Sequence, residues 1–339
     1  MTRRRLVTFS KACTIVPTYE CFNRCTYCNF RKDASGWISL SKAAEIARTN
    51  RDAGATEALV LSGEVHPKSS LRRHWIAHTV EICKVAIQNG LLPHVNVGPL
   101  SWGEMKELTK FSVSMGLMLE QVTDKLMASV HRRAPSKDPS LRIEQLHLAG
   151  QLKIPFTTGI LVGLGEEECD WETSLNCIAA VHNKYGHIQE CIIQPFRPGD
   201  RGYISGPKLN AFHSEALPYV VSLARKILPT EIAIQIPPNL VLSETDRRKG
   251  LELVFRCLEA GASDLGGISP VDEVNPTYAF PSITWLREVL LLEGFELMHR
   301  LPIYEQYIPW IQKAEKFEHL QRLFPVYKQG NSAKSTPKS

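Results

Sequence analysis

Short β-rich runs alternate with helical segments along most of the chain, and this alternation restricts the possible folds more than any other feature of the sequence. We expect strands near residues 13–19, 57–61, 94–97, 115–120, 156–162, 188–193, 232–236 and 263–268. Helical patterns lie near residues 39–53, 69–89, 101–110, 138–151, 170–184, 213–228, 245–260 and 282–293. Eight strands that alternate with eight helices predict an α/β fold, a TIM-type (βα)8 barrel. A doubly wound open sheet is the competing interpretation.

The alternation ends near residue 296, and this change divides the chain into parts. We expect the barrel over residues 1–295 and a short helical C-terminal extension packed on the barrel over residues 296–328. Residues 329–339 are polar and show no periodicity, so the sequence predicts a disordered tail there.

Composition excludes several classes of protein. The chain has 339 residues, of which 43% are hydrophobic and 22% are charged, as in an ordinary globular protein. No apolar stretch approaches the roughly 18 residues of a membrane span. The net charge of +5 comes without a basic stripe, which argues against a nucleic-acid partner. Nine cysteines, an odd number, with no secretory signal indicate a reducing compartment, and we expect a cytoplasmic enzyme.

The strongest chemical signal is a CxxxCxxC run formed by Cys21, Cys25 and Cys28 directly after the first expected strand. Three thiolates within eight residues can surround one metal centre, and three ligands leave one iron of a four-iron cluster open. A structural zinc site usually has a fourth ligand, and none follows nearby. Zinc and plain reduced core cysteines are the alternatives. The other six cysteines are scattered, so we expect no second cluster.

This spacing, with Tyr27 before the last cysteine, resembles the radical S-adenosylmethionine (SAM) superfamily. The resemblance implies that Cys21, Cys25 and Cys28 hold one 4Fe–4S cluster whose open iron binds SAM. It also implies that Tyr27 lies by the adenine of the cofactor. The cluster would then cleave SAM to methionine and a 5′-deoxyadenosyl radical.

Further residues at strand ends match other runs of the superfamily. Ser62, Gly63 and Glu64 stand where the superfamily has Gly-Gly-Glu facing the methionine amino group, with a serine in place of the first glycine. A plain strand-to-helix turn is the alternative for this triplet.

The run from Gly159 to Glu166 resembles the GxIxGxxE run that packs on adenine, which makes Gly159 and Gly163 candidate cofactor-binding residues. Glu120, at the end of the fourth expected strand, is assigned to the ribose or methionine end of SAM. A simple salt bridge is the alternative for Glu120.

Three longer runs narrow the resemblance to the CofG subunits of 7,8-didemethyl-8-hydroxy-5-deazariboflavin (FO) synthase. They cover residues 131–139, 155–163 and 264–276, within a similarity that extends from about Val7 to about Ile308. The resemblance implies closure of the deazaflavin ring of a hydroxybenzyl/ribityl-uracil adduct, with release of ammonia, methionine and 5′-deoxyadenosine. It also implies an upstream CofH-like radical SAM enzyme and a reducing electron donor.

Catalytic residues stay unassigned at this point. The motifs at the ends of strands four to eight are expected to line the substrate side, but the sequence does not distinguish roles among Arg132, Arg133, Asp264 and Asn275. The alternative functions are the tyrosine-adding CofH-like partner, a biotin-synthase-like enzyme, and an iron–sulfur protein that modifies RNA. A solvated face is the alternative for the basic run 131–137.

Overall fold

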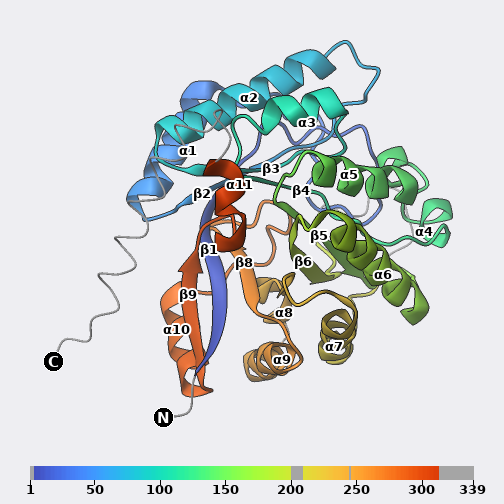
Figure 1. Cartoon of the computed structure of the whole chain (residues 1–339), viewed down its shortest axis with the longest axis vertical. Helices are drawn as coiled ribbons and strands as arrows, with labels where there is room; N and C mark the ends of the chain where they lie inside the picture. The colour runs from blue at the N-terminus through green and yellow to red at the C-terminus, as the bar shows by residue number, and fades with distance from the viewer. Residues whose placement is uncertain (1–3, 200–208, 244–245, 313–339) are drawn as a thin grey trace.

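The computed structural model describes residues 4–199, 209–243 and 246–312. Eight of the strands in these residues form a closed parallel barrel (Figure 1). They are β1 (Arg5–Ile15), β2 (Glu57–Leu61), β3 (Leu92–Asn96), β4 (Ser114–Gly116), β5 (Phe156–Val162), β6 (Ile188–Pro195), β7 (Ala233–Gln235) and β8 (Asp264–Ile268). Because β1 pairs with both β2 and β8, the sheet closes on itself. The TIM-type barrel is confirmed, and the doubly wound open sheet is wrong.

Helices surround the barrel, and each of the eight expected helices is present in the described residues. They are α1 (Leu40–Asp52), α2 (Arg72–Gln88), α3 (Trp102–Leu108), α5 (Pro139–Gln151), α6 (Glu168–Tyr185), α7 (Leu217–Ile227), α9 (Arg247–Glu259) and α10 (Ile283–Leu292). Short helical turns add α4 (Lys125–Ala128), α8 (Pro238–Val241), α11 (Ile308–Gln312), η1 (Pro135–Lys137), η2 (Ser214–Ala216) and η3 (Glu305–Tyr307). Among the helices described, none has the length and apolar character needed to cross a bilayer.

Local sequence sets where these helices begin and end. The Ser39 side chain accepts a hydrogen bond from the backbone N–H of Lys42 and starts α1. Asp138 accepts from the N–H groups of Ser140 and Leu141, and so starts α5. Gly186 ends α6 in the left-handed conformation, at φ 66°, which glycine adopts without strain.

A ninth strand, β9 (Phe295–Arg300), lies outside the barrel and pairs in parallel with the N-terminal half of β1. Residues 8–10 of β1 lie between β8 and β9, so β9 occupies the edge of β1 that β2 leaves free. The sequence predicted a helical extension from residue 296, but residues 295–300 form a strand instead. Phe295 and Leu297 are buried and alternate with exposed residues, which is the pattern of a half-buried strand.

The segment after β9 covers the N-terminal end of the barrel. The Ser114 hydroxyl donates a 2.7 Å hydrogen bond to the Pro302 carbonyl, and the Tyr307 hydroxyl donates one of 3.1 Å to the Ile188 carbonyl. Apolar side chains of this segment pack against Leu92 of β3 and Val113, which precedes β4. The cluster consists of Leu92, Val113, Leu301, Ile303, Tyr307, Ile308 and Ile311. In the described part of the chain, residues 301–311 thus cover the N-terminal end of the barrel, opposite the strand ends where ligands of such barrels bind. The expected tail over 329–339 lies outside the described residues.

Candidate active site

A cavity of about 310 Å³ lies at the C-terminal mouth of the barrel. Loops that follow β1, β2, β3, β4, β6 and β8 contribute to its wall. Eight of the residues singled out in the sequence line it together: Cys21, Cys25, Tyr27, Cys28, Ser62, Gly63, Glu64 and Glu120. Segments up to 100 residues apart in the chain therefore meet at one place, as the barrel fold requires of its strand ends.

Gly159 and Gly163 do not line this cavity. Gly159 lies within β5, where a Cβ atom would come within 2.2 Å of the Ile192 carbonyl oxygen. Gly163 has φ +99°, and a Cβ atom there would lie 2.8 Å from Cβ of Phe212. Both glycines allow close packing of the chain on itself, and their expected contact with the cofactor stays a prediction.

The loop that carries the three cysteines is held by backbone hydrogen bonds to two other segments. The N–H of Phe22 donates to the Glu64 carbonyl at 3.0 Å, which joins the loop to the end of β2. The N–H groups of Arg24 and Thr26 donate to the carbonyls of Arg133 and Val130, at 2.8 and 3.1 Å. The basic run 131–137 therefore supports the cysteine loop from behind.

All three thiols of the loop are free of disulfide bonds. Burial is the main cause that raises the pKa of the Cys21 thiol to about 11, and the Glu64 carboxylate adds to this effect. Burial likewise raises the pKa of Cys25 and that of Cys28. A bound cation reverses this effect and binds the thiols as thiolates, with release of protons. The buried thiols thus fit a cationic metal centre.

Among the described residues, no group of three or more His, Cys, Asp or Glu side chains is arranged to hold a single metal ion. The assignment of the three cysteines to a cluster therefore stays a prediction.

Glu64 lies beside the cysteines in a network of polar side chains. It accepts a 2.9 Å hydrogen bond from the Asn23 amide and another from the Ser136 hydroxyl. Arg142 approaches the same carboxylate at 3.6 Å. Gly98 allows this packing, because a Cβ atom there would lie 2.5 Å from Cγ of Glu64. These contacts fix the orientation of the carboxylate at the cavity wall.

Glu120 forms a second ionic group in the cavity. Its backbone has φ 66°, and its side chain accepts a 2.5 Å hydrogen bond from Lys137, with Arg142 at 3.9 Å. Burial by itself raises the pKa of Glu120, but Lys137 and Arg142 outweigh it and hold that pKa below the ordinary value. Burial and Arg142 lower the pKa of Lys137, but Glu120 outweighs them and raises it. Both groups of this pair are therefore charged.

Tyr27 is fixed by aromatic and polar neighbours. Its ring lies 5.5 Å from the His131 ring and 6.5 Å from the Phe196 ring, measured between centroids. The Tyr27 hydroxyl lies 3.1 Å from Nε2 of His131. Burial lowers the pKa of His131 to about 3, so this imidazole is neutral at pH 7. The aromatic ring expected beside adenine is thus held in one orientation.

Asp264 is not at the mouth, in contrast to what the sequence suggested. It is the first residue of β8 and lies at the closed end, where Arg300 of β9 donates to it at 2.6 and 2.8 Å. Arg300 also donates to Glu190 of β6 at 2.7 Å. The error has a simple cause: the motif starts at the N-terminal end of its strand, whereas ligands of such barrels bind at the C-terminal ends.

The sequence also failed to single out three polar residues of the site: Asn23, Ser136 and Arg142. Asn23 lies inside the cysteine run, and Ser136 lies inside the basic run. Arg132 and Arg133, by contrast, are exposed, as expected of a solvated face. Arg142 is buried on α5, and a charged residue in a surface helix carries no signal that it points inward.

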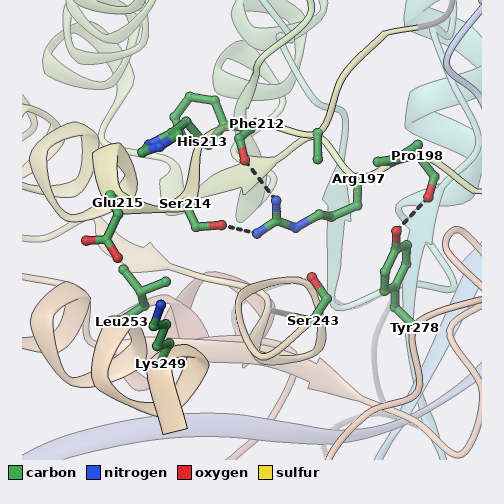
Figure 2. A pocket seen from close by; sticks show the side chains of 11 residues that line it. Arg197, Pro198, Phe212, His213, Ser214, Glu215, Ser243, Lys249, Leu253 and Tyr278 are labelled. Carbon is green, nitrogen blue, oxygen red and sulfur yellow. Dashed lines mark hydrogen bonds between the residues drawn. The ribbon is translucent and has the colours of Figure 1, made fainter. Parts of the chain in front are cut away.

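Arg197, just after β6, holds the loop that borders the cavity. Figure 2 shows its guanidinium donating to the Phe212 carbonyl at 2.8 Å and to the Ser214 hydroxyl. Its Nε donates to the Leu240 carbonyl at 3.0 Å. A second pocket of about 350 Å³ lies beyond Arg197, which therefore separates the two spaces. Arg197 acts here as a structural link rather than as a free cation.

Comparison with known sequences places these features in context. A profile of the radical SAM superfamily matches residues 15–178. The chain is 52% identical over 309 residues to a 7,8-didemethyl-8-hydroxy-5-deazariboflavin synthase of Trichormus variabilis, covering 90% of this chain and 88% of that protein. It is 49% identical to a synthase of the same name from Gloeobacter violaceus, covering 89% and 91%.

Solved structures share the fold at low sequence identity. The FeFe-hydrogenase maturase HydG from Carboxydothermus hydrogenoformans superimposes with a TM-score of 0.71 at 18% identity, covering 96% of this chain and 79% of that one. Methylornithine synthase (PylB) superimposes with a TM-score of 0.66 at 16% identity, covering 87% and 84%. At these identities the likeness establishes the barrel alone.

Proposed function

The chain belongs to the radical SAM superfamily and, within it, to the family of 7,8-didemethyl-8-hydroxy-5-deazariboflavin synthases, and we propose that it catalyses the ring-closing half of that synthesis. The superfamily uses a 4Fe–4S cluster and SAM. The proposed substrate is a hydroxybenzyl/ribityl-uracil adduct, and the proposed products are the deazaflavin, ammonia, methionine and 5′-deoxyadenosine. One observation carries the proposal: three free thiols and Glu64 share one cavity in a chain that is about half identical to these synthases.

Cys21, Cys25 and Cys28 are the residues that would hold the cluster. They are free of disulfide bonds, half-buried, and together line the cavity. When bound, the cluster and SAM together supply a 5′-deoxyadenosyl radical that removes hydrogen from the adduct. Support for the ligand assignment comes from the hydrogen bonds that tie the loop to the end of β2 and to residues 130–133.

Glu64, Glu120 and Tyr27 would position SAM. Glu64 presents a carboxylate to the methionine amino group, next to the backbone of Gly63. Glu120 would lie at the ribose or methionine end of SAM, with Lys137 holding it charged. Tyr27, fixed by His131 and Phe196, provides an aromatic surface for adenine. Ser62 lies within this group of residues and completes the turn after β2.

The closed end of the barrel keeps water away from the reacting groups on that side. Residues 301–312 seal it, so the radical chemistry would take place in a space open only at the mouth. We propose that a CofH-like enzyme supplies the adduct and that a reducing protein supplies electrons. Nine free cysteines agree with a reducing compartment, and we propose the cytoplasm.

An anaerobic assay with the purified, cluster-loaded protein tests this function. With the adduct, SAM and a chemical reductant, the protein should form the deazaflavin chromophore, 5′-deoxyadenosine and ammonium together. With tyrosine and a ribitylaminouracil in place of the adduct, no chromophore should form. Formation of the adduct from those two compounds would identify the CofH-like activity instead. Tight, salt-sensitive tRNA binding without turnover of either mixture would favour an RNA-modifying protein.

A further inference from the structure

Three carboxamide side chains line the mouth cavity without a hydrogen-bond partner. They are Asn96 at the end of β3, Gln194 near the end of β6 and Asn275 in the loop after β8. Within the described part of the chain, no hydrogen bond involves any of these three amide groups, although Asn275 is only 8% exposed. These side chains keep their donor and acceptor groups available at the cavity surface, where a ligand can supply the partner.

The charged side chains of the cavity are already engaged, which separates them from the carboxamides. Lys137 pairs with Glu120, and Arg142 approaches both carboxylates and donates to backbone carbonyls. Arg31 pairs with Asp33, and Arg197 is bound to the carbonyls of its own loop. The hydrogen-bonding capacity that is left on this wall is therefore mainly neutral.

In the barrel order, Gln194 of β6 is four strands from β2, which precedes Glu64, and Asn275 follows β8, which β1 separates from β2. Ile192 and Gln194 are two residues apart on β6, and both line the cavity. Gln194 pairs with Leu161 of β5, so these two residues lie at the same level of the barrel. Asn96, by contrast, is two residues from Gly98, which touches Glu64. Asn96 therefore belongs to the side that would hold methionine, and Gln194 and Asn275 remain for a second molecule.

The loop that carries Asn275 is held rigid by Asp272. The Asp272 carboxylate accepts from the backbone N–H groups of Val274 and Asn275, both at 2.9 Å, and from the Asn239 amide at 2.8 Å. Neighbouring Glu273 accepts from the Tyr19 hydroxyl at 2.7 Å, which ties this loop to the segment before the cysteines. A partnerless amide on a fixed backbone is preorganised for a ligand.

Part of the cavity wall beside the carboxamides is apolar. Leu59, Leu117, Leu161 and Ile192 line it there. A flat molecule with an apolar face and a neutral edge of alternating donors and acceptors would satisfy both parts of the wall. A pyrimidinedione has such an edge, with two carbonyls and a ring N–H, whereas a phenol offers one hydroxyl group only.

We propose that Gln194 and Asn275 bind the pyrimidinedione edge of the substrate and so determine its orientation at the mouth of the barrel. This inference rests on the proposed function for the identity of the substrate. Each carboxamide can donate from its NH2 group and accept at its oxygen, as the imide edge requires. The hydroxybenzyl part then lies over the apolar residues.

The test uses two fragments of the substrate and near-isosteric variants. Gln194→Met and Asn275→Leu keep side-chain size and remove the hydrogen bonds, and Asn176→Leu on the surface of α6 is the control. Binding of a ribitylaminouracil and of 4-methylphenol is measured by equilibrium dialysis with the cluster-loaded, SAM-bound protein. Each cavity variant should weaken binding of the ribitylaminouracil by roughly 5- to 30-fold, the effect of one or two hydrogen bonds. Affinity for 4-methylphenol and for SAM should stay the same in every variant.

Several results would overturn the subsite. Unchanged affinity for the ribitylaminouracil would do so, and so would weaker binding of 4-methylphenol in its place, which would reverse the orientation. Equal losses for all three ligands would assign the two residues a structural role only. Failure of the proposed function is a separate result: the wild-type protein would leave the adduct unconverted, while the uracil affinities still differed between wild type and variants.

Discussion

The ion pairs at the closed end of the barrel provide a prediction whose size follows from the structure. Arg300 donates to both oxygens of Asp264 and to Glu190, and it is the cation that these buried carboxylates share. Burial raises the pKa of Asp264 by itself, but Arg300 outweighs it and holds that pKa below the ordinary value. Burial raises the pKa of Glu190 to about 8, with Arg300 acting against it. In the native protein, Arg300 favours the ionised form of Asp264, and burial favours the protonated form of Glu190.

Replacing Arg300 with Met leaves Asp264 buried without a counterion, so Asp264 should take up a proton on folding. Protonating a carboxyl group of ordinary pKa about 3.9 at pH 7 costs about 4 kcal/mol, since each pH unit corresponds to 1.36 kcal/mol. This agrees with the range of about 3–5 kcal/mol for breaking a buried ion pair from one side. We therefore expect Arg300→Met to lower the free energy of unfolding by about 4 kcal/mol at pH 7.

The pH dependence of this loss distinguishes the ionic explanation from a packing defect. The lowered pKa of Asp264 stabilises the native protein above the unfolded value, and this contribution is constant between pH 5 and 7. In the variant, Asp264 takes up a proton on folding that it does not take up in wild type, so over that interval the stability of the variant increases relative to wild type as the pH falls. The difference from wild type should shrink from about 4 kcal/mol at pH 7 to about 1.5 kcal/mol at pH 5.

Urea unfolding followed by far-UV circular dichroism at pH 7 and pH 5 measures both values. Arg256→Met is the matched control, because Arg256 pairs with Glu215 on the surface, where both side chains are exposed. That variant should lose less than about 1 kcal/mol at either pH. A loss below 1 kcal/mol for Arg300→Met at pH 7, or an equal loss at the two pH values, would refute the reasoning.

Three further predictions concern the mouth of the barrel. Changing any of the three cluster cysteines to Ala should abolish the visible absorbance of the reconstituted cluster. The control Cys177→Ala, outside the cavity, should keep that absorbance. If one of the three variants retained it, that cysteine would not be a cluster ligand. Glu64→Gln should weaken SAM binding by about 1.5–3 kcal/mol in equilibrium dialysis, the range for a hydrogen bond to a charged group, with the cluster intact. Gly98→Ala should also weaken SAM binding because its Cβ would push against Glu64, whereas Gly103→Ala meets open space and should not; equal affinities would show that Glu64 can move freely.

The strand and helix pattern predicted the barrel because each element carries its own periodicity in the sequence. Strand β9 was not predicted because it comes after a complete set of eight strand–helix units and lies outside the barrel. The first residues of β9 alternate between buried and exposed side chains, which is a local pattern typical of a strand. The aromatic and charged segment that follows made the whole region look like an added helix. Only the pairing with β1, 290 residues earlier in the chain, makes this segment a strand.

The site was predictable to the extent that its chemistry depends on spacing along the chain. Cys21, Cys25 and Cys28 share one loop, so their spacing alone indicated a metal centre. Asp264 shows the limit of this approach, because its place in a conspicuous motif said nothing about which end of the strand it occupies. Arg142 marks a second limit, since its contact with Glu64 depends on how α5 packs against the barrel.

The contrast between the two carboxylates at the mouth supports the proposal that Glu64, rather than Glu120, receives an ammonium group. Glu120 already has a cation at 2.5 Å, so a second cation there would first have to displace Lys137. Glu64 has neutral partners in Asn23 and Ser136, and its nearest guanidinium stands 3.6 Å away. The two carboxylates balance Lys137 and Arg142 in charge, which makes their burial tolerable before any ligand binds. Glu64 therefore has the free capacity for an ammonium ion, whereas Glu120 is held by Lys137.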